Sequence, residues 1–264
     1  MEPYTALVLA GRRGPDDPFA RSRGASHRAL LEVAGVPMLV RVLSALRRAR
    51  HVSRICVSID APEVLDALPA LAGWRDDGSL SLHASQRSPA TSVGDALESM
   101  AEERVLVTTA DHALLTGARV DHFLEGAAAT GADVAVGVVE RSAFADADAP
   151  AARTWIRLRC GSYTGANLFA FQHPRARRAA AFFARAERFR KRPWRMIAAL
   201  GPTLGLEYLA GTLDLDTACA QISRSMGASL RPVKLEEAAA AIDVDKPADL
   251  ALAEQILATG DGSA

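Results

Sequence analysis

The sequence has few cysteines and no long apolar run. Its three cysteines, Cys56, Cys160 and Cys219, are widely spaced and form no Cys-x-x-Cys pair. This pattern argues against a disulfide framework and against a cysteine-ligated zinc site, and it fits a reducing cytoplasm. No stretch approaches the roughly 18 apolar residues of a membrane-spanning helix, and the amino terminus lacks the pattern of a signal peptide. We therefore expect a cytoplasmic protein without a transmembrane segment.

Net charge is also lacking. The 31 basic side chains are balanced by 31 acidic ones, so the sequence does not have the overall basic field typical of nucleic-acid-binding proteins. Lysine is scarce, because only Lys191, Lys234 and Lys246 occur and the other basic residues are arginines. We expect small-molecule partners and no nucleic acid.

The clearest pattern present is an alternation of strand-like and helix-like segments. Such alternation predicts βαβ units and an α/β fold with a mostly parallel, three-layer, Rossmann-like sheet. The 264 residues suffice for one large domain, which we assign to residues 1–264. Strands are expected near residues 5–10, 54–59, 79–84, 104–109, 132–140, 166–171 and 229–234. Helices are expected near residues 38–50, 62–72, 90–102, 117–130, 174–190 and 247–257.

Residues 186–226 differ from this pattern, because they read as short helices broken at Pro193, Gly201-Pro202 and Gly211 without a strand signal. We predict that residues 174–226 form a mainly helical insertion or lid. The apolar part of this segment, residues 193–213, also suits an apolar acceptor or the face of a homodimer, although packing of a buried lid explains it equally well.

An arginine-rich loop follows the first predicted strand. The apolar run ends at Leu9 and Ala10, and the loop then begins with Gly11, Arg12, Arg13 and Gly14 and reaches Arg28. Open α/β sheets bind ligands outside the carboxyl ends of their strands, and arginine holds phosphate in bidentate fashion. The loop therefore predicts a polyphosphate site, although it is neither a GxxxxGK[ST] nor a GxGxxG sequence.

Three aspartates are candidates for binding Mg²⁺. Asp111 directly follows a buried strand, and Asp243 and Asp245 lie just before the last helix. Mg²⁺ prefers a few carboxylates together with phosphate oxygens. The alternative is that Asp111 caps a turn and that Asp245 caps the helix starting at Pro247.

Further candidates are polar residues near other predicted strands. Ser85 and Ser92 lie around the start of a helix and could hold a base, ribose or phosphate, or simply cap that helix. Tyr163 and Asn167 lie in a glycine-flanked segment that precedes an expected strand over residues 168–171, and this segment is either close to a ligand or a tight turn. Lys191 belongs to a basic cluster that either binds an acceptor phosphate or is a solvated helix end.

Taken together, these segments resemble the nucleotidyltransferases of the nucleotide-diphospho-sugar transferase fold. This MobA-like group contains molybdenum cofactor guanylyl- and cytidylyltransferases and the methylerythritol phosphate cytidylyltransferase. Residues 9–14 (LAGRRG) and 27–39 (HRALLEVAGVPML) match its LAGGxGxRM…PKxLxxLxGxPLL pattern, and residues 89–97 (PATSVGDAL) match R-x-x-SV-x-x-AL. Residues 110–115 (ADHALL) and 245–250 (DKPADL) match its (A/C)D-x-PLL and (D/N)-T-P-x-DL segments. Two departures stand out, since Arg12 replaces the second loop glycine and Arg28 replaces the lysine of PK.

The resemblance implies a reaction in which a phosphorylated small-molecule acceptor attacks the α-phosphorus of an NTP, CTP or GTP being favoured, and pyrophosphate leaves. It implies triphosphate contacts from residues 9–14 and Arg28, with Arg13 and Arg28 stabilising charge. It further implies Mg²⁺ on Asp111 and Asp245 with Asp243, a base near Ser85 and Ser92, and an acceptor near Tyr163, Asn167 and Lys191. Two alternatives stay open: a glycosyltransferase of the same fold using Asp243-Val244-Asp245, and a non-catalytic nucleotide-binding protein, which the replacement at Arg28 suggests.

Overall fold

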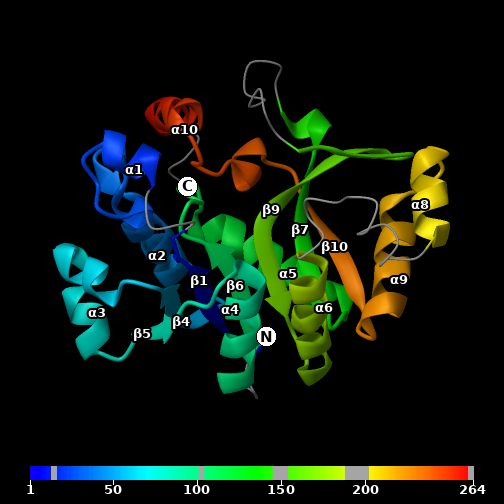
Figure 1. Ribbon diagram of the computed structural model, residues 1–264, viewed down its shortest axis with the longest axis horizontal. Coiled ribbons are helices and arrows are strands. Elements are labelled where there is room, and N and C mark those ends of the chain that lie inside the picture. The colour runs from blue at the N-terminus through cyan, green and yellow to red at the C-terminus, as the bar shows by residue number, and fades with distance from the viewer. Residues whose placement is uncertain (13–16, 101–103, 145–153, 188–201, 261–264) are drawn as a thin grey trace.

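The computed structural model describes residues 1–12, 17–100, 104–144, 154–187 and 202–260 (Figure 1). Three of the predicted site residues, Arg13, Gly14 and Lys191, lie outside these ranges. The described helices are α1 (Pro18–Ser22), α2 (Met38–Arg48), α3 (Ala72–Asp76), α4 (Pro89–Ser99), α5 (Gly117–Thr130), α6 (Arg177–Glu187), α8 (Pro202–Leu209), α9 (Leu215–Met226) and α10 (Pro247–Thr259). Among the described residues, no helix combines the length and apolarity needed to cross a membrane.

A mixed, mostly parallel sheet forms the centre of the fold. Its strand order is β10-β7-β9-β6-β1-β4-β5, and β8 pairs with β9. The strands are β1 (Tyr4–Leu9), β4 (Val52–Ile59), β5 (Leu80–Ala84), β6 (Arg104–Thr109), β7 (Val134–Glu140), β8 (Ile156–Leu158), β9 (Gly161–Phe171) and β10 (Leu230–Leu235). In the main path, strand β9 runs antiparallel to its neighbours β6 and β7. A small hairpin of β2 (Glu32–Val33) and β3 (Val36–Pro37) lies apart.

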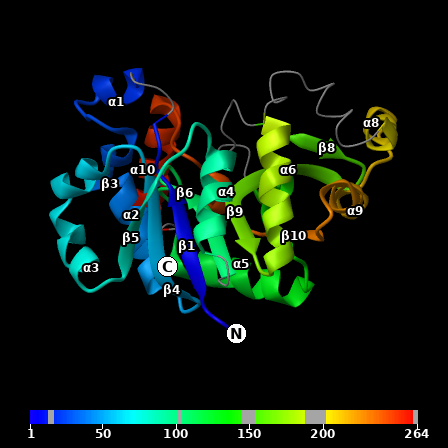
Figure 2. The same cartoon turned by 60° about the horizontal axis from the view of Figure 1, so that its bottom comes forward.

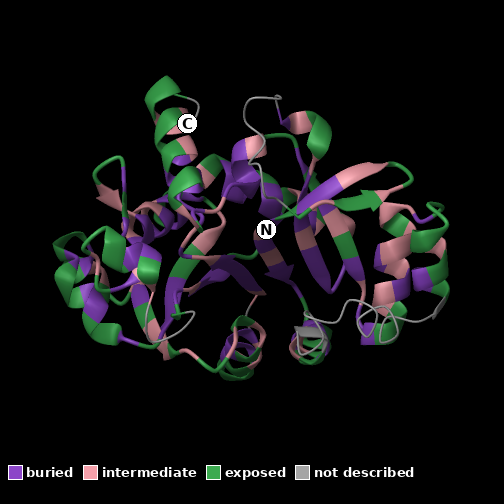
Figure 3. Ribbon diagram, turned by 45° about the horizontal axis from the view of Figure 1, so that its top comes forward, coloured by how far each residue is buried: buried purple, intermediate pink, exposed green. Residues whose placement is uncertain are grey.

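Helices cover both faces of the sheet and make it the middle of three layers. Helices α4 and α6 lie side by side on one face (Figure 2), where their apolar residues join a core with those of α9. Helices α2 and α5 cover the other face and contribute to the larger core. Buried residues accordingly concentrate along the strands, and exposed ones on the outer sides of the helices (Figure 3). The expected three-layer α/β architecture is confirmed.

Two local predictions were wrong. Residues 62–72 form two short 3₁₀ helices, Pro62–Ala67 and Pro69–Leu71, before α3 instead of one helix. Pro69 has no N–H to donate and restricts the residue before it, so a continuous α-helix cannot pass through this position.

The second error concerns residues 161–167, which belong to strand β9 and do not form a turn before it. The strand continues through an irregularity in its pairing with β7 between Val136 and Val138. Near this point Asn167 has a left-handed backbone, with φ of 48°. Val136 pairs with Phe169 and Val138 with Gly165, so β9 accommodates two extra residues here without ending the strand.

Candidate functional site

Two adjoining cavities lie at the carboxyl ends of β1, β4 and β6. Both are lined by Leu9, Gly11, Arg12 and Asp111. The first is lined by residues of α1 and of the loop before a short 3₁₀ helix, Arg28–Leu30, and its further lining residues include Ala10, Asp17, His27 and Arg28. The second, with a volume of about 470 Å³, extends toward the start of α4, and its further lining residues include Ser58, Ser85, Gln86, Ser92 and Thr109. The predicted ligand edge of the sheet is therefore hollowed.

Gly11 brings the first loop close to the loop after β5. A Cβ atom at this position would lie 3.1 Å from the hydroxyl oxygen of Ser85. A contact this short leaves little room for any side chain, so the glycine permits the backbone of the first loop to pass between the two cavities.

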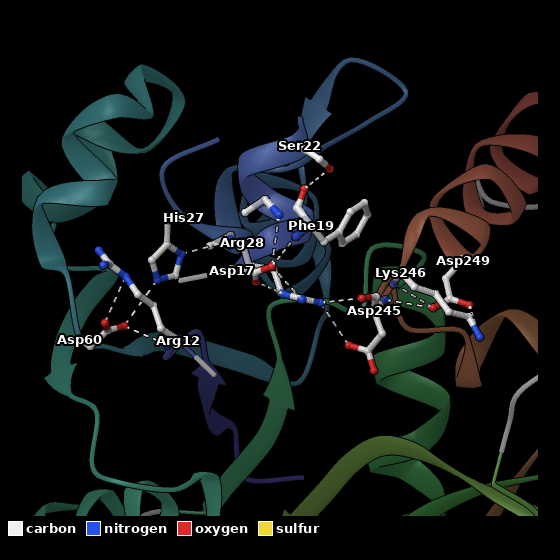
Figure 4. A network of polar contacts seen from close by, with 12 residues as sticks. Arg12, Asp17, Phe19, Ser22, His27, Arg28, Asp60, Asp245, Lys246 and Asp249 are labelled. Atoms are coloured by element: carbon white, nitrogen blue, oxygen red, sulfur yellow. Dashed lines mark hydrogen bonds and ion pairs between the residues drawn. The ribbon is translucent and has the colours of Figure 1, made fainter. Parts of the chain in front are cut away.

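Arg12 is held by an aspartate at the end of the neighbouring strand. Its backbone N–H donates to Asp60 Oδ1 at 3.0 Å, and its Nε lies 3.3 Å from Asp60 Oδ2 (Figure 4). His27 Nε2 approaches the same carboxylate at 3.4 Å, while His27 Nδ1 accepts the N–H of Ala29 at 3.1 Å. Since Nδ1 is an acceptor, the neutral tautomer carries its proton on Nε2 and donates it to Asp60. Burial lowers the pKa of His27, which favours this neutral form.

Arg28 links two distant parts of the chain. Its Nε and Nη2 donate to the two oxygens of Asp17 at 2.6 and 3.2 Å, and its Nη1 donates to the backbone carbonyl of Asp245 at 2.9 Å. The Asp245 carboxylate lies 3.5 Å away, and the Phe19 ring centre 5.6 Å from the guanidinium carbon. Hydrogen bonds from Arg28 hold the pKa of Asp17 below its ordinary value.

The Asp111 loop and the segment 243–245 lie against each other. The N–H of Val244 donates to the carbonyl of Asp111 at 2.9 Å. The predicted meeting of these segments is therefore present in the structure. Asp245 does not cap α10, because its N–H donates to Asp249 Oδ2 at 3.1 Å and the cap position is Lys246.

Arg119 connects the loop after Asp111 with the chain that leads to residues 243–245. This buried side chain, 7% exposed, donates to the carbonyl of Leu114 in the loop after Asp111. Its Nε also donates to Glu237 Oε2 at 2.6 Å, just before the chain reaches residues 243–245. One arginine thus connects the β6 loop to the carboxyl-terminal segment.

The predicted base-side serines both line the second cavity. The Ser92 hydroxyl accepts the N–H of Gln86 at 2.8 Å and so holds the loop between β5 and α4. Ser88, which was not singled out from the sequence, provides the helix cap by accepting the N–H of Thr91. Ser85 remains the serine that faces Gly11.

Tyr163 and Asn167 lie elsewhere on the sheet. Tyr163 is 2% exposed, and its hydroxyl donates to the carbonyl of Cys160 at 3.3 Å. Burial raises the pKa of this phenol. Neither residue lines the two described cavities, so the structure does not bring them to the arginines.

The donor set suits a cation that also binds phosphate. Within the described ranges, no three His, Cys, Asp or Glu side chains gather closely enough to hold a metal ion. A protein site of one or two carboxylates is what Mg²⁺ uses when substrate phosphates complete its coordination. Asp111 and the 243–245 segment fit a site of this type. The described residues do not fit a metal site built from protein ligands alone.

Sequence reasoning missed Asp17, Asp60, Ser58 and Thr109. A signal for Asp60 existed, because it directly follows an apolar strand as Asp111 does. Asp17 precedes Pro18, a pattern of helix starts, and its carboxylate accepts the N–H of Phe19 at 3.1 Å. The hydroxyls of Ser58 and Thr109 lie at strand ends, where only pairing of the strands shows that they share one cavity.

Comparison with known proteins agrees with this arrangement. The chain is 30% identical to a hypothetical transferase of Thermus thermophilus, with a TM-score of 0.77, covering 95% of this chain and 100% of the other. It shares its fold with a CMP:2-keto-3-deoxy-manno-octonic acid synthetase in complex with CTP (13% identity, TM-score 0.62, covering 98% and 100%). It also shares this fold with the 4-diphosphocytidyl-2C-methyl-D-erythritol synthase of Anaerococcus prevotii (12% identity, TM-score 0.58, covering 97% of this chain and 96% of the other).

A search among curated proteins found no match. The fold of these structural neighbours confirms the expected nucleotide-diphospho-sugar transferase architecture. The model of the MobA-like NTP transferase domain matches residues 6–203, which include the first loop, the α4 segment and Asp111. The chain therefore belongs to the family of MobA-like NTP transferase domains.

Proposed function

We propose that the protein is an Mg²⁺-dependent nucleotidyltransferase that moves an NMP from an NTP to a phosphorylated small-molecule acceptor and releases pyrophosphate. The observation that carries this proposal is the convergence of Arg12, Arg28, Asp111 and residues 243–245 at one edge of the sheet. Cationic groups suited to a triphosphate and the Asp111 carboxylate thereby line the same cavities, and Asp245 contacts Arg28 beside them.

The proposed reaction needs positioning and charge neutralisation more than covalent help. An oxygen of the acceptor phosphate attacks the α-phosphorus of the NTP, and the bond from that phosphorus to the β-phosphate oxygen breaks. Gly11 offers backbone close to the triphosphate, and Arg12, Arg13 and Arg28 stabilise its charge. The guanidinium of Arg28 carries five N–H groups, so its contacts with Asp17 and Asp245 leave donors for phosphate oxygens.

Asp111 and Asp245, with Asp243 beside them, are the proposed carboxylates for Mg²⁺. When bound, this cation would neutralise charge on the phosphate oxygens. Lys191 and the β9 residues around Asn167 are proposed to face the acceptor, and the buried Tyr163 would support that side from within the sheet.

CTP and GTP are the favoured substrates. Two structural neighbours are named for cytidylyl chemistry, which supports CTP, and the resemblance to molybdenum cofactor guanylyltransferases supports GTP. The second cavity, with its polar lining, suits the nucleoside part of either.

The test is a pyrophosphate-release assay with each of the four NTPs, Mg²⁺ and a panel of sugar, alcohol and pterin phosphates. We expect release with one NTP and one acceptor class, and its loss in Asp111→Asn. Nucleotide-sugar consumption without pyrophosphate release would instead indicate a glycosyltransferase. NTP binding without turnover of any acceptor would contradict the enzyme proposal and favour a non-catalytic nucleotide-binding protein.

A further inference from the structure

The second cavity has a floor made by three neighbouring strands. Leu9 of β1 is in register with Ser58 of β4 on one side and with Thr109 of β6 on the other. In a parallel sheet, residues in register point to the same face. These three side chains therefore form one row at the carboxyl edge, on the face that α4 and α6 cover (Figure 2).

One row deeper, the same face is apolar. Leu7 lies between Cys56 and Val107, and this row packs against Val93 and Leu97 of α4 in the second core. The polar row thus begins where the core gives way to the cavity. Serine and threonine at this edge are not explained by packing, since an apolar side chain would continue the core.

Both hydroxyls of the row lack a partner within the described residues. Ser58 is fully buried, and its Oγ and the buried Oγ1 of Thr109 make no hydrogen bond there. A buried hydroxyl without a hydrogen bond costs free energy. Because both residues line the cavity, a ligand placed in it can satisfy them.

The distance between the two hydroxyl residues excludes a single phosphate group as the partner of both. Ser58 and Thr109 lie two strands apart, which corresponds to roughly 10 Å. A single phosphate cannot reach both, whereas a nucleoside can. Arg12 lines both cavities and Arg87 lines the second, but most other polar residues of the second cavity carry hydroxyl or amide groups, namely Ser58, Ser85, Gln86, Ser88, Ser92 and Thr109.

We infer that Ser58 and Thr109 are specificity-determining residues that hydrogen-bond the nucleoside part of the NTP. This inference rests on the proposed function and adds to it two residues outside the sequence motifs. The hydroxyls rotate to donate or to accept, so each can match a different edge of a base or ribose. Neither has a hydrogen-bond partner among the described residues, and a bound nucleotide would supply one to each.

The test compares Ser58→Ala, Thr109→Val and the control Thr108→Val. The Thr108 hydroxyl is equally buried and without a partner among the described residues, but Thr108 does not line the cavity. Melting temperature is measured without ligand, and binding is measured by calorimetry for ATP, GTP, CTP and UTP with Mg²⁺. Tripolyphosphate with Mg²⁺ serves as a probe that lacks a nucleoside.

We expect all three variants to melt at or above the wild-type temperature, because each loses an unsatisfied hydroxyl. Ser58→Ala and Thr109→Val should raise the Kd of the preferred NTP about 3- to 10-fold each, with no change for tripolyphosphate. Thr108→Val should change neither Kd. Equal NTP affinity in all variants, or an equal loss for NTP and tripolyphosphate, would overturn the inference alone. Wild-type protein that binds none of the four nucleotides would overturn the proposed function itself.

Discussion

The contacts of Arg28 explain why a guanidinium occupies a position where the family pattern has lysine. Its planar fork bonds both oxygens of Asp17 and still reaches the carbonyl of Asp245. An ammonium group is a single point of charge and cannot span these partners in the same geometry. In this chain the arginine therefore holds the Asp245 segment, in addition to its proposed role of stabilising phosphate charge.

Replacing Arg28 separates these two contributions. We expect Arg28→Ala to lower kcat/KM by about 10²–10³, the usual effect of removing one charge-stabilising donor. Arg28→Lys keeps the charge and should lose less activity, but it should lower the free energy of unfolding by about 1.5–3 kcal/mol because charged hydrogen bonds disappear. Steady-state kinetics and urea unfolding measure the two effects.

Arg23→Ala is the matched control, since Arg23 comes from the same arginine-rich loop but lines neither described cavity. It should leave both quantities close to wild type. If Arg28→Lys has wild-type stability and raised activity, the hydrogen bonds of Arg28 to Asp17 and Asp245 are dispensable.

Asp17 gives the protein a defined dependence on acid. The pKa of Asp17 lies below its ordinary value of 3.8, and the largest cause is the hydrogen bond from Arg28. Below that value the unfolded chain binds the proton more readily than the folded one. The stabilisation is therefore complete above about pH 4 and is lost as the pH falls toward the lower folded-state pKa.

Asp17→Asn can keep the cap of α1 but removes the ion pair. Its free energy of unfolding should be lower than that of wild type at pH 7, and the difference should shrink as the pH falls below about 4. Urea unfolding at several pH values measures this convergence. Parallel curves for the two proteins over this range would contradict the assignment.

Individual site residues could be predicted from the sequence only where they follow an obvious strand. Asp111 was found in this way, and its contact with the 243–245 segment is present in the structure. Asp60 follows strand β4 in the same manner, but its pairing with Arg12 is not visible in the sequence. Arg12 and Asp60 are 48 positions apart. Their contact depends on the path of the loop after β1, which the hydrophobic pattern of the sequence does not indicate.

The effect of replacing a helical glycine on the free energy of unfolding depends on the atoms that the new side chain would meet. In α5, a Cβ atom at Gly126 would lie 2.7 Å from Val233 Cγ1 of β10. Overpacking typically costs about 1–3 kcal/mol, which exceeds the gain of about 1 kcal/mol in helix propensity. In α4, a Cβ at Gly94 would meet no atom within 4 Å among the described residues, apart from its chain neighbours and the backbone of its own helix.

We therefore predict opposite signs for the two replacements. Gly126→Ala should lower the free energy of unfolding, and Gly94→Ala should raise it by about 0.5–1 kcal/mol. Chemical denaturation of both variants measures the difference. Stabilisation of both would mean that β10 can shift away from α5 at no cost.

Element prediction succeeded where one pattern dominated and failed where local chemistry intervened. The parallel strands are apolar runs bounded by loops, so their positions could be read directly. The break at Pro69 and the bulge near Asn167 are single-residue effects that an averaged pattern does not resolve. The antiparallel direction of β9 depends on the path of the preceding chain, which no local pattern specifies.

The complete domain brings the beginning and the end of the chain together at one edge. Arg28 and Asp245, in contact, are 217 positions apart, and Arg119 ties the central loop to Glu237. The carboxyl-terminal segment therefore adjoins the candidate site. Its placement depends on the three layers being formed, so binding at this edge should report on folding of the entire domain.

A cation that relies on two protein segments and on substrate phosphates should bind together with the nucleotide. Because no three-residue metal group exists among the described residues, Mg²⁺ alone should change the melting temperature little. With the preferred NTP at about 100 times its Kd, the stabilisation should reach about 2.7 kcal/mol, or roughly 5–10 °C. EDTA should remove most of this increase, and Asp111→Asn should abolish the synergy between metal and nucleotide. An equal increase of the melting temperature with Mg²⁺ alone would require a metal site formed entirely by protein ligands. It would contradict the proposal that substrate phosphates complete the coordination of Mg²⁺.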